Sequence, residues 1–259
     1  MPYVELPAGR IWYEEAGRGP AVVCLHSGWG RAVMPFDDAR ERLASSYRLI
    51  FPDRRGYGRS DGVDRLPAHY HADAAEELHS FLDALALDRP ILWGHSDGAI
   101  TAALHAAARP DRVRALVLES VHFRRRKSRE FFERHEQDPE SLPGAAQARL
   151  AADHGDPRWQ AVIRMHSRAW LELHDLGGDF YDGALERIRC PVLVVHGARD
   201  PHTPIDEIEE LLGHLARAEV AILEAGGHSP HSEPVTARAV TDRVATFLAT
   251  LGETAPSLG

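Results

Sequence analysis

The chain has 259 residues, of which 44% are hydrophobic and 27% charged, a composition typical of an ordinary globular protein. The formal net charge of −9 argues against nucleic acid as a partner. Because the sequence has neither an apolar run of about 18 residues nor a basic and apolar leader, we expect no membrane span, no secretory signal and a cytoplasmic location.

The cysteines and histidines suggest no metal chemistry. Cys24 and Cys190 each lie in an apolar, strand-like run, which favours buried free thiols in a reducing compartment over a disulfide. The 16 histidines include no His-x-x-x-His pair, and the sequence has no Cys-x-x-Cys motif. We therefore expect no metal and no cofactor.

The predicted elements alternate between strands and helices in chain order. Apolar runs bounded by turn residues predict strands over 4–6, 11–15, 21–25, 47–51, 91–93, 113–118, 191–195 and 220–223. Helical spacing and stop signals predict helices over 36–44, 71–85, 97–108, 206–215 and 234–250. This rhythm is typical of βαβ units, so we predict an α/β fold with a mostly parallel, doubly wound sheet.

The alternation is interrupted once. Between residues 122 and 183 no apolar strand occurs, and three helical stretches, 124–137, 144–154 and 159–176, are separated by prolines. We interpret residues 122–183 as a helical cap inserted into a core formed by residues 1–121 and 184–259.

A serine lies between two glycines where a predicted strand meets a predicted helix. The motif is Gly94-His95-Ser96-Asp97-Gly98, a G-x-S-x-G sequence in a strand–turn–helix context. Such a tight turn holds the serine in strained backbone geometry and requires small residues two positions away on either side. We predict that Ser96 is a nucleophile and that His95 points away from it and packs in the core.

A nucleophilic serine requires a base and an acid that orients this base. Functional residues of parallel sheets follow the carboxyl ends of strands, and two candidates come after Ser96 in the chain. Asp200 follows the strand 191–195, and His228 follows the strand 220–223. Glu119 is an alternative acid and His231 an alternative base, while Asp200 could instead cap a helix.

Negative charge that develops on a substrate needs preorganised hydrogen-bond donors. The backbone N–H of Asp97, at the start of a helix, is one candidate. The second is the N–H of Gly28, in the glycine-rich loop 26–30 that follows a predicted strand. The alternative interpretation of this loop is a simple flexible turn between a strand and a helix.

Five motifs together resemble those of a known superfamily. They are His26-Ser27-Gly28-Trp29-Gly30, Asp53-x-Arg55-Gly56-Tyr57-Gly58-x-Ser60, Gly94-His95-Ser96-Asp97-Gly98, His196-Gly197-x-x-Asp200, and Gly227-His228 with Glu233-Pro234. The chain is similar over nearly its whole length to the α/β-hydrolase superfamily. Within it, Ser96-Asp97-Gly98, Ile100-Thr101-Ala102 and the Arg55–Gly58 loop resemble the biphenyl hydrolase-like (valacyclovir hydrolase) group.

The resemblance implies an α/β-hydrolase fold, with Ser96 as nucleophile, His228 as base, Asp200 as the orienting acid and residues 122–183 as the cap. Many relatives have glycine at the position of Ser27, so a positive φ there would strain this loop. Relatives similar to dehalogenases and epoxide hydrolases have aspartate at the position of Ser96, which separates this chain from them.

The resemblance also implies a role for Asp97, because the narrower group uses an acid beside the nucleophile to bind a substrate amine. An ammonium about 4 Å from a carboxylate gains about 4 kcal/mol at an effective dielectric constant near 20, against about 1 kcal/mol in water. The alternative is that Asp97 only favours the start of the helix.

Three further sets of residues have two interpretations each. Residues 53–60 form either a binding loop or, as we prefer, a structural network of ion pairs and turns. The basic run 124–127 with Arg129 either attracts an anionic substrate or, as we prefer, lies on an exposed, charged helix face. Trp29, Trp159 and Trp170 are candidates to line an apolar substrate pocket; Trp159 and Trp170 could instead pack the cap.

The predicted activity is hydrolysis of a small carboxylic ester through an acyl-serine intermediate, with α-amino acid esters as a candidate substrate class. The expected partner is therefore a small-molecule ester, and the oligomeric state is not predicted. Two alternatives stay open. One is a carbon–carbon bond hydrolase of ring-cleavage products, which uses the same three residues, and the other is a ligand receptor on a hydrolase fold.

Overall fold

The computed structural model describes residues 3–253, and its eight strands form one sheet. The strands are β1 (Tyr3–Leu6), β2 (Gly9–Ala16), β3 (Ala21–Leu25), β4 (Arg48–Pro52), β5 (Ile91–His95), β6 (Ala115–Glu119), β7 (Val192–Gly197) and β8 (Ala218–Leu223). The main helices are α1 (Asp37–Leu43), α2 (Tyr70–Ala84), α3 (Asp97–Ala108), α4 (Arg129–Gln137), α5 (Gly144–His154), α6 (Arg158–Leu176), α7 (Ile205–Gly213) and α8 (Ala237–Glu253). The predicted α/β fold with a mostly parallel sheet is confirmed.

The order of the strands, β1-β2-β4-β3-β5-β6-β7-β8, places the functional loops together. β2 is antiparallel to both of its neighbours, β1 and β4, and β4, β3, β5, β6, β7 and β8 are mutually parallel. Leu25 of β3 is in register with Gly94 of β5, which is in register with Leu118 of β6. The loops after these strands therefore leave the same edge of the sheet, where ligands bind in folds of this type.

The two faces of the sheet have separate hydrophobic cores, since side chains of a strand alternate between faces. In β3, Val23 and Leu25 pack with residues of α2 and α3 such as Leu82 and Ile100. The intervening Val22 and Cys24 pack on the other face with residues of α1 and α8 such as Phe247. Burial on both faces explains why the parallel strands are continuous apolar runs in the sequence.

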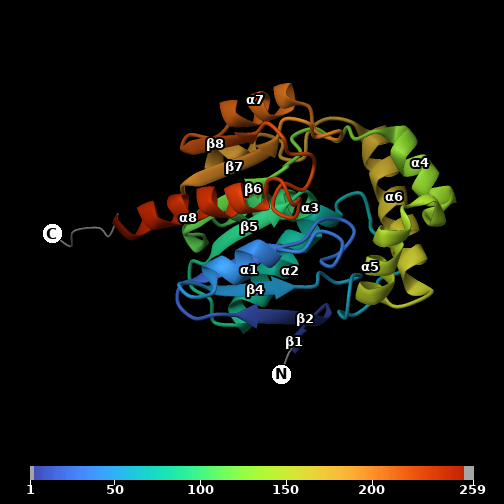
Figure 1. The fold of residues 1–259 in the computed structure, drawn as a ribbon, viewed down its shortest axis with the longest axis horizontal. Helices are drawn as coiled ribbons and strands as arrows, with labels where there is room; N and C mark the ends of the chain where they lie inside the picture. Colours follow the sequence, from blue (N-terminus) through green and yellow to red (C-terminus); the bar gives the residue numbers. More distant parts are fainter. Residues whose placement is uncertain (1–2, 254–259) are drawn as a thin grey trace.

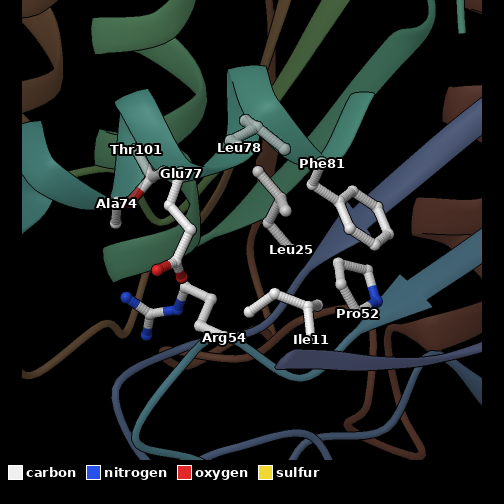
Figure 2. Close-up of a pocket in the computed structure, with 9 residues that line it drawn as sticks. All are labelled: Ile11, Leu25, Pro52, Arg54, Ala74, Glu77, Leu78, Phe81 and Thr101. Carbon is white, nitrogen blue, oxygen red and sulfur yellow. The ribbon is translucent and has the colours of Figure 1, made fainter. Parts of the chain in front are cut away.

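A small hollow lies within the first of these cores, between the sheet and helices α2 and α3 (Figure 2). Its walls are mainly apolar side chains such as Leu25, Leu78 and Phe81. Its volume of about 20 Å³ suffices for about one water molecule, so it is a packing gap and not a substrate site.

Residues 122–183, which we call the cap segment, contain helices α4, α5 and α6. These helices stand together on one side of the sheet and its covering helices (Figure 1). The rings of Phe132 in α4 and Trp170 in α6 stack with centroids 5.6 Å apart. The exact limits of core and cap stay a prediction. In the part of the chain that the structure describes, no helix has the length and apolar character to cross a membrane.

One cap helix begins later than the sequence predicts. The expected helix over 124–137 starts at Arg129, because Ser128 is its N-cap and accepts a hydrogen bond from the N–H of Phe131 at 3.3 Å. Residues before Ser128 are therefore not helical, and Arg124 forms a β-bridge with Asp179. The basic run 124–127 therefore does not lie on a helix, and the predicted exposed helix face is wrong for these residues.

Candidate active site

Ser96 occupies a strained turn between β5 and α3, as the motif predicts. Its φ and ψ are 53° and −117°, a conformation that is uncommon for residues with a side chain. A Cβ atom on Gly94 would lie 2.3 Å from the carbonyl oxygen of Gly98, and one on Gly98 would lie 2.2 Å from that of Leu25. The two glycines are therefore required by the close approach of strand, turn and helix.

A chain of hydrogen bonds connects Ser96, His228 and Asp200. The Ser96 Oγ lies 3.0 Å from His228 Nε2, and His228 Nδ1 lies 2.8 Å from Asp200 Oδ2. The other carboxylate oxygen of Asp200 accepts from the backbone N–H groups of His202 and Thr203. Burial alone would raise the pKa of Asp200, but the bonds from His228 and the N–H of His202 depress it strongly. An ionised Asp200 keeps the proton on Nδ1, so Nε2 is free to accept the Ser96 proton.

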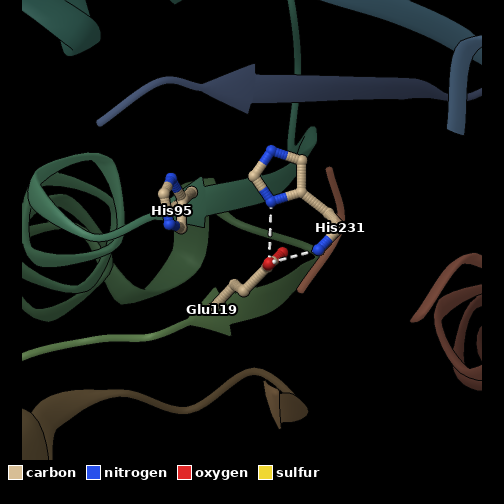
Figure 3. Close-up of side chains that lie close together, drawn as sticks. All are labelled: His95, Glu119 and His231. Atoms are coloured by element: carbon tan, nitrogen blue, oxygen red, sulfur yellow. Dashed lines mark hydrogen bonds and ion pairs between the residues drawn. The ribbon is translucent and has the colours of Figure 1, made fainter. Parts of the chain in front are cut away.

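The alternative acid and base, Glu119 and His231, pair with each other (Figure 3). Glu119 Oε1 accepts from the backbone N–H and the Nδ1 of His231, at 2.8 and 2.7 Å. His231 Nε2 donates to the carbonyl of Met34 at 3.1 Å, so both ring nitrogens carry protons and His231 is cationic. Burial opposes this charge, but Glu119 dominates and raises the pKa of His231.

The same three side chains, His95, Glu119 and His231, are close enough to suggest a metal site. His231 cannot serve as a ligand while both of its nitrogens donate hydrogen bonds, because a metal needs a free lone pair. His95 Nε2 lies 2.8 Å from the carbonyl oxygen of His228 and 3.3 Å from the hydroxyl of Ser229. We therefore interpret this cluster as a support for the loop that carries His228, which agrees with the predicted packing role of His95.

The loop after β3 is held in place by its own side chains. His26 Nδ1 donates to the carbonyl of Ser27 at 2.6 Å, and the Arg54 guanidinium donates to the same carbonyl at 2.8 Å. Ser27 is not among the described residues with positive φ, so it replaces glycine without the strain considered above. None of the hydrogen bonds within residues 3–253 uses the backbone N–H of Gly28 or of Asp97. Both donors are thus available to a ligand.

Asp97 has a fully buried side chain with a set of internal partners. Its Oδ2 accepts from the hydroxyl of Tyr70 at 2.7 Å and from His166 Nε2 at 2.9 Å. His71 Nε2 lies 3.6 Å from this oxygen. Burial would raise the pKa of Asp97, but His166 and Lys127 hold it well below the ordinary value. The carboxylate is therefore ionised and already compensated from within the protein, and it lies in the first turn of α3, where a negative charge is also favourable.

Lys127 is the largest correction to the sequence analysis. We expected it on an exposed charged face, but its side chain is buried and lines the cavity beside Ser96. Its Nζ lies 3.2 Å from Ser96 Oγ and 3.6 Å from Asp97 Oδ1, and it sits 4.0 Å from the centre of the Trp170 ring. Burial lowers the pKa of Lys127, against the opposite effect of Asp97 and Asp200. One feature of the sequence could have shown that residues 124–127 precede the helix, since Ser128 is a typical N-cap, but no feature indicated the burial of Lys127.

His122 is a second residue that the sequence analysis missed. Its Nε2 lies 3.4 Å from Ser96 Oγ, and its Nδ1 lies 2.7 Å from the hydroxyl of Thr203. Burial lowers the pKa of His122 well below 6.5, and Lys127 and His228 act in the same direction. The ring is therefore neutral. It follows β6 directly, a position that the strand-end rule could have selected.

The cavity at Ser96 has a volume of about 160 Å³. Its wall combines the predicted nucleophile and its neighbours with aromatic and histidine side chains: Ser27, Gly28, Trp29, Met34, Ser96, Lys127, Phe131, Phe132, His166, His202 and His228. Trp29 lines it, as expected. Trp159 and Trp170 are not part of this wall: Trp159 packs with Leu150 and Ile163 in the cap segment, and Trp170 lies behind Lys127.

The side chains of the loop 53–60 form a structural network of ion pairs and turns, which is the interpretation that we preferred. Arg31 and the N–H of Arg59 bind the carboxylate of Asp53, and the hydroxyl of Ser60 donates to the carbonyl of Asp53. Arg55 pairs with Glu77 at 2.8 Å. This network fixes Arg54, which in turn holds the carbonyl of Ser27 in the loop after β3.

The fold, the serine turn and the cavity define a hydrolase, and comparison with known proteins identifies the family. A profile of the alpha/beta hydrolase family matches residues 22–240, so the chain belongs to this family. The human serine hydrolase BPHL is 25% identical to this chain over 236 residues; the match covers 86% of this chain and 78% of that protein. This confirms the resemblance to the biphenyl hydrolase-like group.

Two further similar proteins differ in what they share with this chain. Epoxide hydrolase 2 of Siraitia grosvenorii is 40% identical, but the match covers only 42% of this chain and 35% of that protein. The crystal structure of the enol-lactonase from Burkholderia xenovorans LB400 superposes with a TM-score of 0.74 at 20% identity, over 96% of this chain and 100% of that one. At this level of identity the likeness shows a common fold.

Proposed function

We propose that this hydrolase cleaves small carboxylic esters through an acyl-serine intermediate formed on Ser96. The observation that carries the proposal is the hydrogen-bonded chain Ser96–His228–Asp200, whose serine opens into a cavity of about 160 Å³. A serine hydroxyl is a weak nucleophile until a base takes its proton, and this arrangement supplies the base together with a group that orients it.

In the first half-reaction, Ser96 Oγ attacks the ester carbon while His228 Nε2 takes the hydroxyl proton. The oxyanion of the tetrahedral intermediate accepts hydrogen bonds from the N–H groups of Gly28 and Asp97. The intermediate then collapses, the bond to the alcohol breaks, and His228 returns the proton to the departing alkoxide. In the second half-reaction a water molecule attacks the acyl-enzyme while His228 takes its proton. The bond between the acyl carbon and Ser96 Oγ then breaks, and His228 returns the proton to Ser96 Oγ.

Recognition of a substrate amine by Asp97 is not part of the proposal. The place beside the Asp97 carboxylate is already occupied by the ammonium of Lys127, 3.6 Å away. A second ammonium about 4 Å from Lys127 would be repelled by about 4 kcal/mol at an effective dielectric constant near 20, which offsets the attraction to Asp97. A preference for α-amino esters is therefore not expected.

The nucleophile assignment is tested with p-nitrophenyl esters of short acids. Ser96→Ala is expected to lose essentially all turnover, and a fluorophosphonate is expected to label the wild-type protein at Ser96. The matched control is Ser45→Ala, which removes an exposed hydroxyl and is expected to keep wild-type rates. Normal turnover by Ser96→Ala, or ligand binding without turnover by the wild type, would overturn the proposal.

A further inference from the structure

The position of Lys127 places one positive charge inside the catalytic cavity. The ammonium lies 3.2 Å from the oxygen that becomes the ester oxygen of the acyl-enzyme. A lysine ammonium has three N–H donors, and only the one to Ser96 is used at hydrogen-bond distance within residues 3–253. The contact with Asp97 Oδ1, at 3.6 Å, is an ion pair longer than a normal hydrogen bond. Lys127 can therefore donate to a ligand in the cavity.

The charge of Lys127 is balanced by the buried carboxylate of Asp97, 3.6 Å away, but only Lys127 of this pair lines the cavity. Among the described residues, no acidic side chain lines the cavity, because Asp97 lies behind the wall. The histidines His166 and His202 also line it, and burial lowers the pKa of each ring, so both are neutral. A small ligand would thus meet one ammonium and no carboxylate from residues 3–253, a setting that suits an anion.

We propose that the cavity selects esters whose acyl group carries a second, anionic group, such as half-esters of short dicarboxylic acids, and that Lys127 binds this group. The inference rests on the proposed function and names its substrate class. The acyl side is favoured because Lys127 lies beside Ser96 Oγ, to which the acyl group stays bonded after the alcohol has left. Lys127 is then a specificity-determining residue.

The wild-type protein tests the proposal with three p-nitrophenyl esters of similar acyl length. They are the butyrate, the β-alaninate, which has an ammonium in place of the terminal methyl group, and the hemisuccinate, which has a carboxylate there. Rates are corrected with Ser96→Ala, since the esters also hydrolyse spontaneously. The expected order of kcat/KM is hemisuccinate, then butyrate, then β-alaninate. A preference for butyrate or β-alaninate would overturn the proposal.

The variant Lys127→Met keeps the length of the side chain and removes its charge. The ratio of kcat/KM for hemisuccinate to that for butyrate is expected to fall about tenfold or more, the effect of losing a hydrogen bond to a charged group. Using the ratio cancels any change in the reactivity of Ser96. The matched control is Arg126→Met, which removes the neighbouring exposed charge and is expected to keep the ratio.

The outcomes separate this inference from the proposed function. If the wild type hydrolyses none of the esters, the proposed function fails. If it hydrolyses them through Ser96 but Lys127→Met keeps the wild-type ratio, only the role of Lys127 fails. The order measured with the wild type decides the proposal even where Lys127→Met does not fold.

Discussion

The buried pair of Glu119 and His231 allows a sharp prediction about stability. Glu119 is fully buried and accepts three hydrogen bonds, from the indole of Trp93 at 3.0 Å and from the backbone and ring of His231 at 2.8 and 2.7 Å. Glu119→Gln leaves the His231 cation in the core without its counterion. Removing one partner of such a pair typically costs about 3–5 kcal/mol, which lowers Tm by about 10 °C in a domain of this size.

Equilibrium unfolding in urea, followed by tryptophan fluorescence, measures this loss. The matched control is Glu130→Gln, at an exposed glutamate 3.5 Å from Arg134, where the loss is expected to stay below about 1 kcal/mol. If Glu119→Gln destabilises the protein no more than the control does, the buried ion pair is not the anchor that we describe. Activity should fall together with stability, because His231 shares its loop with His228.

The same pair predicts how its contribution to stability depends on pH. The pKa of Glu119 is lowered from 4.5, since His231 overcomes the opposing effect of burial, so its contribution is present above pH 4.5 and is lost as pH falls through the lowered value. The pKa of His231 is raised from 6.5, so its contribution is complete below pH 6.5 and is lost as pH rises through the raised value. The difference in stability between wild type and Glu119→Gln should therefore be largest between the lowered pKa of Glu119 and the raised pKa of His231. It should shrink below the first and above the second.

Three further predictions concern the site and the cap segment. Asp200→Asn is expected to lower kcat by about 10⁴-fold with little change in KM, because His228 loses the tautomer that accepts the Ser96 proton; steady-state kinetics measure this, and a loss below tenfold would contradict it. Protein labelled with ¹⁵Nζ-lysine should give one side-chain NMR signal, titrating below 10.5, because Lys127 is buried and is the only lysine; a midpoint at or above 10.5 would contradict the burial of this charge. Trp159→Ala should destabilise the protein by about 3–5 kcal/mol but keep the hemisuccinate-to-butyrate ratio, since Trp159 packs within the cap segment and does not line the cavity; urea unfolding and ester kinetics check both, and a changed ratio would place Trp159 in substrate selection.

The sequence by itself determined the class of fold and predicted the nucleophile, because both depend on local patterns. Strands buried on both faces, such as β3 and β7, must be continuous apolar runs, and these were visible at 21–25 and 191–195. The serine turn was visible because Gly94 and Gly98 have no room for a Cβ atom. The chain order of Ser96, Asp200 and His228 then indicated the triad, although Glu119 and His231 were open alternatives.

Only the tertiary structure showed which histidine pairs with each of these acids and placed Lys127 beside Ser96. Glu119 and Asp200 both lie at or after the ends of strands, so either could be the orienting acid. Which one lies near Ser96 depends on which histidine of the loop after β8 each of them contacts. For Lys127 the local composition was misleading, because four consecutive basic residues normally face solvent. Its burial depends on contacts with Ser96 and Asp97, from 30 residues earlier in the chain, and with Trp170 of α6. Contacts between such distant segments leave no periodic pattern in the sequence, so the charge inside the active site could be located only once the chain was folded.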